Sequence, residues 1–149
     1  MPAAILMKKD LKAWVGSLTD VYTVYAPKHK GNDFTFERIH SLDEMVLDYS
    51  KTILPLKKFL IPPSEPILRF EEGGVRRQLE EKGASKTLLF GVHPCDANSF
   101  TVLDKVFINE HKDDRYAKRR ENIVTVVIAC SEPGETCFCS SMGTGPSLD

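Results

Sequence analysis

Two short apolar runs in the second half of the chain have the length and composition of buried β-strands. The first covers residues 86–92, and the second, at 123–130, is rich in β-branched valine and isoleucine. Between them, residues 97–107 carry apolar side chains at helical spacing, among them Phe100 and Leu103. A strand, a helix and a second strand in this order predict parallel pairing with a right-handed crossover.

The first half of the chain predicts one helix and two strands. Residues 10–18 have apolar positions at helical spacing, and Asp10 is a suitable N-cap. Residues 21–26 and 34–39 have the composition of short strands, and a polar turn over residues 28–33 separates them. These elements extend the expected sheet beyond its parallel part.

The middle of the chain is less regular. Ser41 and Glu44 fit a capping box, which predicts a short helix over residues 42–48. Residues 53–70 contain several prolines, and proline lacks a backbone donor, so this stretch is predicted to be an extended edge or a wrapping loop. Its apolar side chains are either buried core or a docking surface for another protein; they are Leu56, Phe59, Leu60 and Ile61.

A further helix is predicted over residues 75–82, with Gly83 as its C-terminal stop. The whole pattern indicates an α/β fold: a central mixed, partly parallel sheet with flanking helices. In such sheets, ligands bind beyond the carboxyl ends of the strands. The chain is expected to carry a long loop at that edge after residue 130.

Composition narrows the class of protein. At 149 residues with 42% hydrophobic side chains, residues 1–149 are predicted to form a single domain. A net charge of -1 argues against a nucleic-acid-binding protein, and no apolar stretch reaches the ~20 residues that span a bilayer. No signal peptide is recognisable, so a reducing, cytoplasmic compartment is expected.

The four cysteines gather at the predicted carboxyl edge of the sheet. Cys95 follows the strand at 86–92, and the other three follow the strand at 123–130; they are Cys130, Cys137 and Cys139. Four thiolates around one point can hold a 4Fe-4S cluster or a structural zinc ion. A reducing compartment disfavours disulfides, and a Cys-x-Cys pair is tight for zinc. Iron–sulfur, zinc and a redox pair of thiols at Cys137 and Cys139 remain open on spacing alone.

Three blocks of sequence resemble a known family. They are residues 51–63, Gly91-Val-His-Pro-Cys-Asp-Ala97, and the run from Cys130 to Pro146. Together they resemble the N-terminal domain of the 4Fe-4S dicluster electron-transfer subunits, the family of the sulfhydrogenase beta subunit and of the corresponding component of anaerobic sulfite reductase. Family members continue into a ferredoxin-like region with two Cys-x2-Cys-x2-Cys runs, whereas this chain stops at Asp149.

The resemblance implies that Cys95, Cys130, Cys137 and Cys139 hold a single 4Fe-4S cluster. It also implies an electron-transfer subunit of a hydrogenase, sulfite reductase or heterodisulfide reductase-like complex in anaerobic metabolism. The partners would be a catalytic subunit, a ferredoxin-like subunit, and a flavoprotein carrying the flavin. His93 is either a hydrogen-bond donor beside the cluster, a replacement ligand or an ordinary loop histidine, and Asp96 is expected to cap the helix at Ala97. The alternative function is an interaction module with a structural four-cysteine zinc site.

Overall fold

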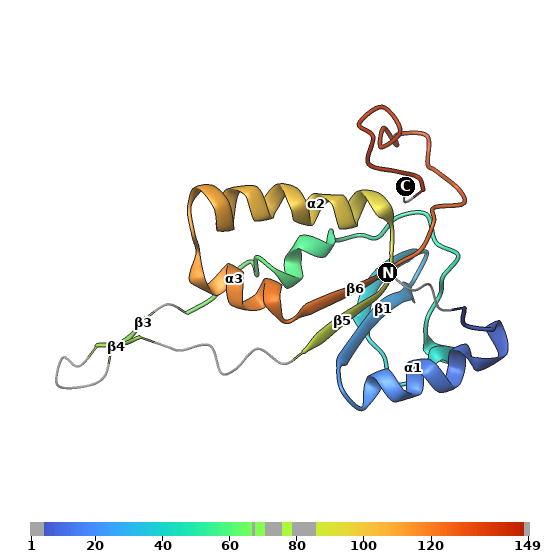
Figure 1. Cartoon of the computed structure of the whole chain (residues 1–149), viewed down its shortest axis with the longest axis horizontal. Helices are drawn as coiled ribbons and strands as arrows, with labels where there is room; N and C mark the ends of the chain where they lie inside the picture. The colour runs from blue at the N-terminus through green and yellow to red at the C-terminus, as the bar shows by residue number, and fades with distance from the viewer. Residues whose placement is uncertain (1–4, 67, 71–75, 79–85, 148–149) are drawn as a thin grey trace.

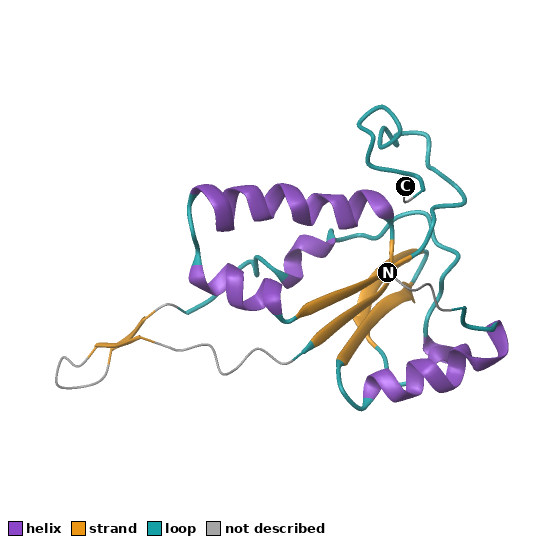
Figure 2. Cartoon of the chain, viewed as in Figure 1, coloured by secondary structure: helices purple, strands orange, loops and turns teal. Residues whose placement is uncertain are grey.

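A mixed sheet forms the centre of the molecule. The computed structural model describes residues 5–66, 68–70, 76–78 and 86–147. The strand order is β2-β1-β5-β6, with bounds of Asp33–Arg38, Thr23–Lys30, Thr87–Val92 and Ile123–Val127. Strands β1 and β2 pair antiparallel, whereas β1 with β5 and β5 with β6 pair parallel. These pairings confirm the predicted α/β class (Figures 1 and 2).

Helices cover both faces of this sheet (Figure 1). One face is covered by α1 (Leu11–Thr19), which follows the short turn η1 (Lys8–Asp10). The other face is covered by α2 (Pro94–Asp104), by its π-helical continuation η4 (Lys105–Glu110) and by α3 (Asp114–Glu121). Within the described ranges, none of these helices is long and apolar enough to cross a membrane.

Strand β5 supplies side chains to two hydrophobic clusters, one on each face. Leu88 and Phe90 pack in the cluster that contains Val15 of α1, whereas Leu89 and Val92 pack in the cluster that contains helix residues of the opposite face. Strict alternation would place Val92 on the same face as Leu88 and Phe90. The register of β5 on β6 shifts between Phe90 and Val92, and this bulge turns Val92 to the other face.

The proline-rich stretch wraps along the sheet, as expected, and contains the short turn η3 (Leu56–Phe59). Leu56 and Leu60 are completely buried in the core, so the docking surface proposed for these side chains is wrong for both. Ile61 is 38% exposed. Because buried apolar area stabilises the fold, Leu56 and Leu60 fix the stretch to the core, whereas Ile53 and Leu54 are 52% and 53% exposed.

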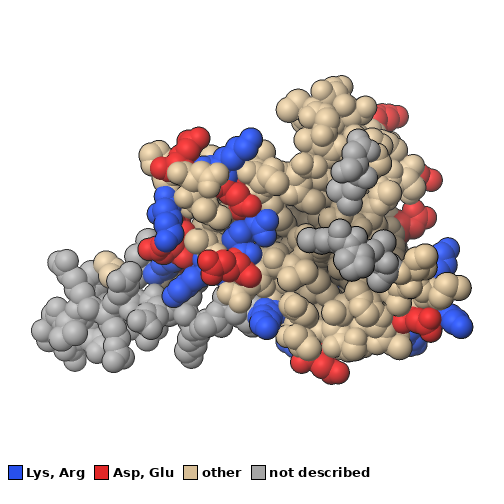
Figure 3. Space-filling view, in the orientation of Figure 1, with Lys and Arg blue, Asp and Glu red and all other residues tan. Residues whose placement is uncertain are grey.

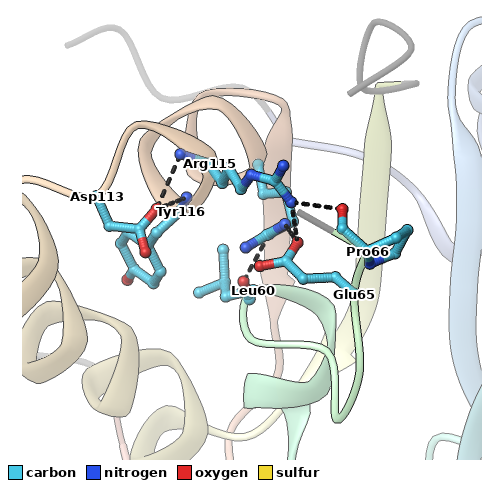
Figure 4. Close-up of polar contacts among 7 residues, drawn as sticks. Leu60, Glu65, Pro66, Asp113, Arg115 and Tyr116 are labelled. Atoms are coloured by element: carbon cyan, nitrogen blue, oxygen red, sulfur yellow. Dashed lines mark hydrogen bonds and ion pairs between the residues drawn. The ribbon is translucent and has the colours of Figure 1, made fainter. Parts of the chain in front are cut away.

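Helix α3 holds the end of this wrapping stretch through two arginines (Figure 4). Arg119 donates to the Leu60 carbonyl at 2.7 Å and to the Glu65 carboxylate at 2.8 Å. Arg115 donates to the Pro66 carbonyl at 3.1 Å. The Asp113 carboxylate caps α3 by accepting from two backbone amides of its first turn. The loop is therefore fixed to the helix by charge-assisted hydrogen bonds.

The predicted helix over residues 75–82 is wrong where the structure describes it. Arg76–Gln78 forms strand β4, which pairs antiparallel with β3 (Leu68–Phe70). The remainder of that prediction, including Gly83, lies outside the described residues. An isolated helix of this length is marginal in water, so pairing with a neighbouring strand readily overrides the local preference.

The capping box at Ser41 is present, but it starts only the turn η2 (Leu42–Glu44) and not a helix to residue 48. The Glu44 carboxylate accepts hydrogen bonds from the backbone amides of His40 and Ser41. A hydrogen bond from Lys28, followed by that from the His40 amide, lowers the pKa of Glu44. The box thus stabilises a sharp change of chain direction.

Of two predicted helix caps, one is confirmed in position and one is wrong. Asp10 is the N-cap residue of α1, as predicted, but its side chain makes no capping bond. Helix α2 begins at Pro94, so Asp96 lies in its first turn instead of before it, and His93 occupies the N-cap position. Proline favours the first position of a helix because its missing N–H has no partner there anyway. Cys95 therefore belongs to the helix, one residue after its start.

Candidate metal centre

Two cysteines follow the carboxyl ends of adjacent parallel strands. Val92, at the end of β5, pairs with Val127, at the end of β6. Cys95 lies three residues beyond the first of these positions and Cys130 three residues beyond the second. The prediction that both cysteines leave the sheet at one edge is confirmed by this register.

The loop from Cys130 to Pro146 carries the other two cysteines and closes on itself. The Cys130 amide donates to the Pro146 carbonyl at 3.1 Å, so the two ends of the loop are joined. Inside it, the amides of Met142 and Thr144 both donate to the Cys139 carbonyl, at 3.1 and 2.9 Å. These bonds fold the backbone around Cys139 into successive turns, which Figure 1 shows as the loop above the sheet.

The closed loop packs against the start of α2. The side-chain amide of Asn98, in α2, donates a hydrogen bond to the Thr144 carbonyl at 3.3 Å. A Cβ atom added at Gly145 would lie 3.4 Å from the Cys139 sulfur and 3.5 Å from the Pro94 Cβ. The close approach at Gly145 therefore brings Cys139 next to the helical turn that carries Cys95.

Three of the four thiols line one cavity of about 360 Å³. Cys95 contributes from α2, and Cys137 and Cys139 contribute from the loop. The remaining lining is uncharged: Asn98, Ser99, Val102, Thr136, Phe138, Met142 and Thr144. The loop at the top of Figure 3 likewise shows few charged atoms. Cys95 and Cys137 are exposed, so the cavity opens to solvent.

All four cysteines are free thiols. Burial, and secondly the negative charge of Asp96, raise the pKa of Cys95. A thiol in such a setting is a poor nucleophile, because the thiolate is its reactive form. A bound metal reverses this preference, since metal ligation favours the thiolate.

Tyr49 contacts the chain between β5 and Cys95. The Tyr49 hydroxyl donates to the Gly91 carbonyl at 2.8 Å, and its ring stacks on His93 with centroids 4.2 Å apart and planes 6° apart. Burial raises the pKa of Tyr49 strongly, and negative charge on Asp96, Cys95 and Cys130 raises it further. Tyr49 therefore contacts the end of β5, which leads to Cys95.

His93 is a buried polar residue with an exposed fraction of 5%. Burial lowers the pKa of its imidazole, which favours the neutral ring. A neutral imidazole has one donor and one acceptor nitrogen. Within the described part of the chain, no protein group forms a hydrogen bond with either of them.

The thiols are not arranged around a single ion. In the described ranges, no three side chains of His, Cys, Asp or Glu are placed to hold one metal ion. Tetrahedral zinc at about 2.3 Å from each sulfur would draw its four thiolates into mutual contact. In a 4Fe-4S cluster each cysteine binds a different iron, so the four sulfurs stay farther apart. Three of the four thiols line the cavity, and Cys130 is not among its lining residues.

Tyr49 was not identified from the sequence. It is separated from Gly91 by 42 residues, and no local pattern signals such a contact. Gly91 itself was noted only as part of a block of sequence, although its positive φ of 81° and the bulge make it a specific feature of the site.

Fold and site together define an α/β domain with a candidate iron–sulfur centre at the carboxyl edge of its sheet. Over 132 residues, which are 89% of the chain, the sequence is 41% identical to Sulfhydrogenase 2 subunit beta of Pyrococcus furiosus. This similarity supports the family of sulfhydrogenase beta and dicluster electron-transfer subunits that the motifs of the chain indicated. The match covers 38% of that protein, so the chain spans about two fifths of its relative's length. No family model and no solved structure matches the chain.

Proposed function

We propose that this chain is an iron–sulfur electron-transfer component of a hydrogenase-type oxidoreductase complex. Cys95, Cys130, Cys137 and Cys139 would hold one 4Fe-4S cluster. The main support is that free thiols follow two adjacent parallel strands at one sheet edge, and that three of them line a single cavity. The similarity to a sulfhydrogenase subunit supports the same proposal.

A bound cluster would supply one-electron redox chemistry, and the chain's own residues would control its environment. The four thiolates would hold it between the end of β6 and the first turn of α2. Phe138 and Met142 line the cavity but are 70% and 65% exposed, so water would reach the cluster from this side, and solvent exposure affects the redox potential of a cluster. Free thiols of this kind fit a reducing compartment such as the cytoplasm.

Such a component needs an electron donor and an acceptor. We expect a flavoprotein as one partner and a hydrogenase or reductase as the other, with a ferredoxin-like subunit or region completing the relay. Co-purification from the native host is expected to recover a redox complex. A chain that remains alone there and reduces a substrate unaided would contradict the electron-transfer role.

Metal analysis of anaerobically purified protein tests the cofactor. We expect about four iron and four sulfide per chain and a brown colour with broad visible absorption. Colourless protein with one zinc ion per chain would instead support the structural zinc module. Metal-free protein with reversible oxidation of Cys137 and Cys139 would support a thiol switch.

Single substitutions test the ligands. Changing any one of Cys95, Cys130, Cys137 or Cys139 to Ala is expected to remove most of the iron, because each thiolate holds one iron of the cluster. Ser140→Ala is the matched control, since it changes a neighbouring loop residue that carries no thiol. Full iron content in the Cys95→Ala protein would contradict the four-ligand arrangement.

A further inference from the structure

Tyr49 attaches the wrapping segment to the chain that leads to Cys95. Its hydroxyl bonds to the Gly91 carbonyl, and its ring stacks on His93, two residues further along. These two contacts hold the strand end on both sides of Val92. The Tyr49 side chain is 7% exposed and packs in the core, so it is itself rigidly supported.

Gly91 makes this attachment possible. Its φ of 81° belongs to the left-handed region, and the bulge at this position displaces the strand end. The peptide that follows Phe90 therefore departs from the regular ladder, and the Gly91 carbonyl accepts from Tyr49. His93, Pro94 and Cys95 follow directly, so Tyr49 fixes the direction in which the chain enters the site.

The His93 imidazole lacks a hydrogen-bond partner among the described residues, although His93 is buried, with only 5% of its surface exposed. A buried N–H without a partner is destabilising, and native structures rarely leave one unpaired. The stack on Tyr49 orients the ring, and His93 precedes Cys95 by only two residues. The sulfur atoms of thiolates and of a cluster accept hydrogen bonds, so a bound cluster would satisfy this donor.

We propose that His93 donates a hydrogen bond to the sulfurs of the iron–sulfur group, and that Tyr49 is the positioning residue that holds His93 and Cys95 in place. This inference rests on the proposed function and adds to it a determinant of the redox potential. Hydrogen bonds to sulfur stabilise the more negative, reduced state of a cluster and raise its potential. His93 is therefore a tuning residue and not a fifth ligand.

The test compares five variants of the anaerobically reconstituted protein with the wild type. His93→Phe keeps a stacking ring but removes the donor, whereas His93→Gln keeps an N–H donor. Tyr49→Phe keeps the ring but removes the hydroxyl. The controls are His111→Phe, at the far end of the helical segment that begins beside Cys95, and Tyr116→Phe, which removes a buried hydroxyl bonded to Asp104. Iron content, midpoint potential and the electron paramagnetic resonance spectrum are measured for each.

His93→Phe is expected to retain iron and to lower the equilibrium constant for reduction about tenfold, which is 59 mV for a one-electron couple. We expect His93→Gln to recover most of this shift, and Tyr49→Phe to show a smaller shift of the same sign with a changed spectrum. Both controls are expected to match the wild type. A merely structural role for His93 would change stability without moving the potential.

An unchanged potential and spectrum in His93→Phe, in a protein with full iron content, would overturn the inference alone. If His93→Phe fails to bind iron, Tyr49→Phe decides: a shifted spectrum supports the inference, and wild-type behaviour overturns it. Wild-type protein without iron would instead refute the proposed function, so the two failures are distinguishable.

Discussion

Substitution of Gly91 by Ala tests how tightly the fold constrains the site. An alanine Cβ at this position would lie 3.0 Å from the Leu47 Cδ2 and 3.3 Å from the Pro27 Cδ, at a φ of 81°. The left-handed conformation costs an L-residue about 1–2 kcal/mol, and overpacking costs about 1–3 kcal/mol. The stiffer unfolded chain offsets about 0.4–1 kcal/mol of this. The expected net loss in the free energy of unfolding is about 2–3 kcal/mol.

Gly31→Ala is the matched control, because Gly31 has a φ of 64° and a Cβ there would meet nothing within 4 Å. It carries the backbone cost without the steric cost, so we expect a loss of only about 1 kcal/mol. Urea unfolding of the metal-free, reduced proteins measures both losses. Equal destabilisation by the two substitutions would show that the packing around Gly91 does not constrain the strand end. Gly91→Ala is also expected to lower iron content, whereas Gly31→Ala is not.

Two further predictions concern residues away from the cysteines. Arg119→Ala removes the charge-assisted hydrogen bonds to the Leu60 carbonyl and the Glu65 carboxylate. We expect the free energy of unfolding, measured in urea, to fall by about 2 kcal/mol. A loss below about 0.5 kcal/mol would show that the wrapping stretch is held by packing alone. Glu44→Gln tests the lowered pKa of Glu44. The ionised carboxylate stabilises the folded protein at pH values above its ordinary pKa of 4.5, and this stabilisation is lost as the pH falls through the lower pKa of the folded state. The difference in stability between Glu44→Gln and the wild type should therefore be larger at pH 7 than at pH 3, and a pH-independent difference would contradict this linkage.

The sheet was predictable because its strands have a strong local signal. Residues 86–92 and 123–130 are short apolar runs, and the helix between them required parallel pairing, so the location of Cys95 and Cys130 at one edge followed. Residues 75–82 lacked such a signal. Val75 and Leu79 are four residues apart, which fits a helix, and only the pairing of residues 76–78 with another strand reveals β4. Local periodicity is weak wherever tertiary pairing decides the structure.

The details of the site were less accessible to sequence reasoning. Proline is common in the first turn of a helix, so Pro94 predicts the start of α2 correctly, whereas the acidic side chain of Asp96 predicts a start that is too late. The contacts of Tyr49 depend on a chain separation of 42 residues and on the positive φ of Gly91. Neither property is encoded by the neighbouring residues alone.

The strand order also has a consequence for how the protein folds. Strand β5 lies between β1 and β6, and Thr23 of β1 pairs with Thr87 of β5 across a long stretch of sequence. Closing a loop of this size before its contacts form slows folding. The parallel part of the sheet cannot assemble until β5 has been synthesised, and its edge with β6 requires residues further still along the chain. Because Cys130, Cys137 and Cys139 follow β6, a group held by all four cysteines could bind only after this last part of the chain has been synthesised.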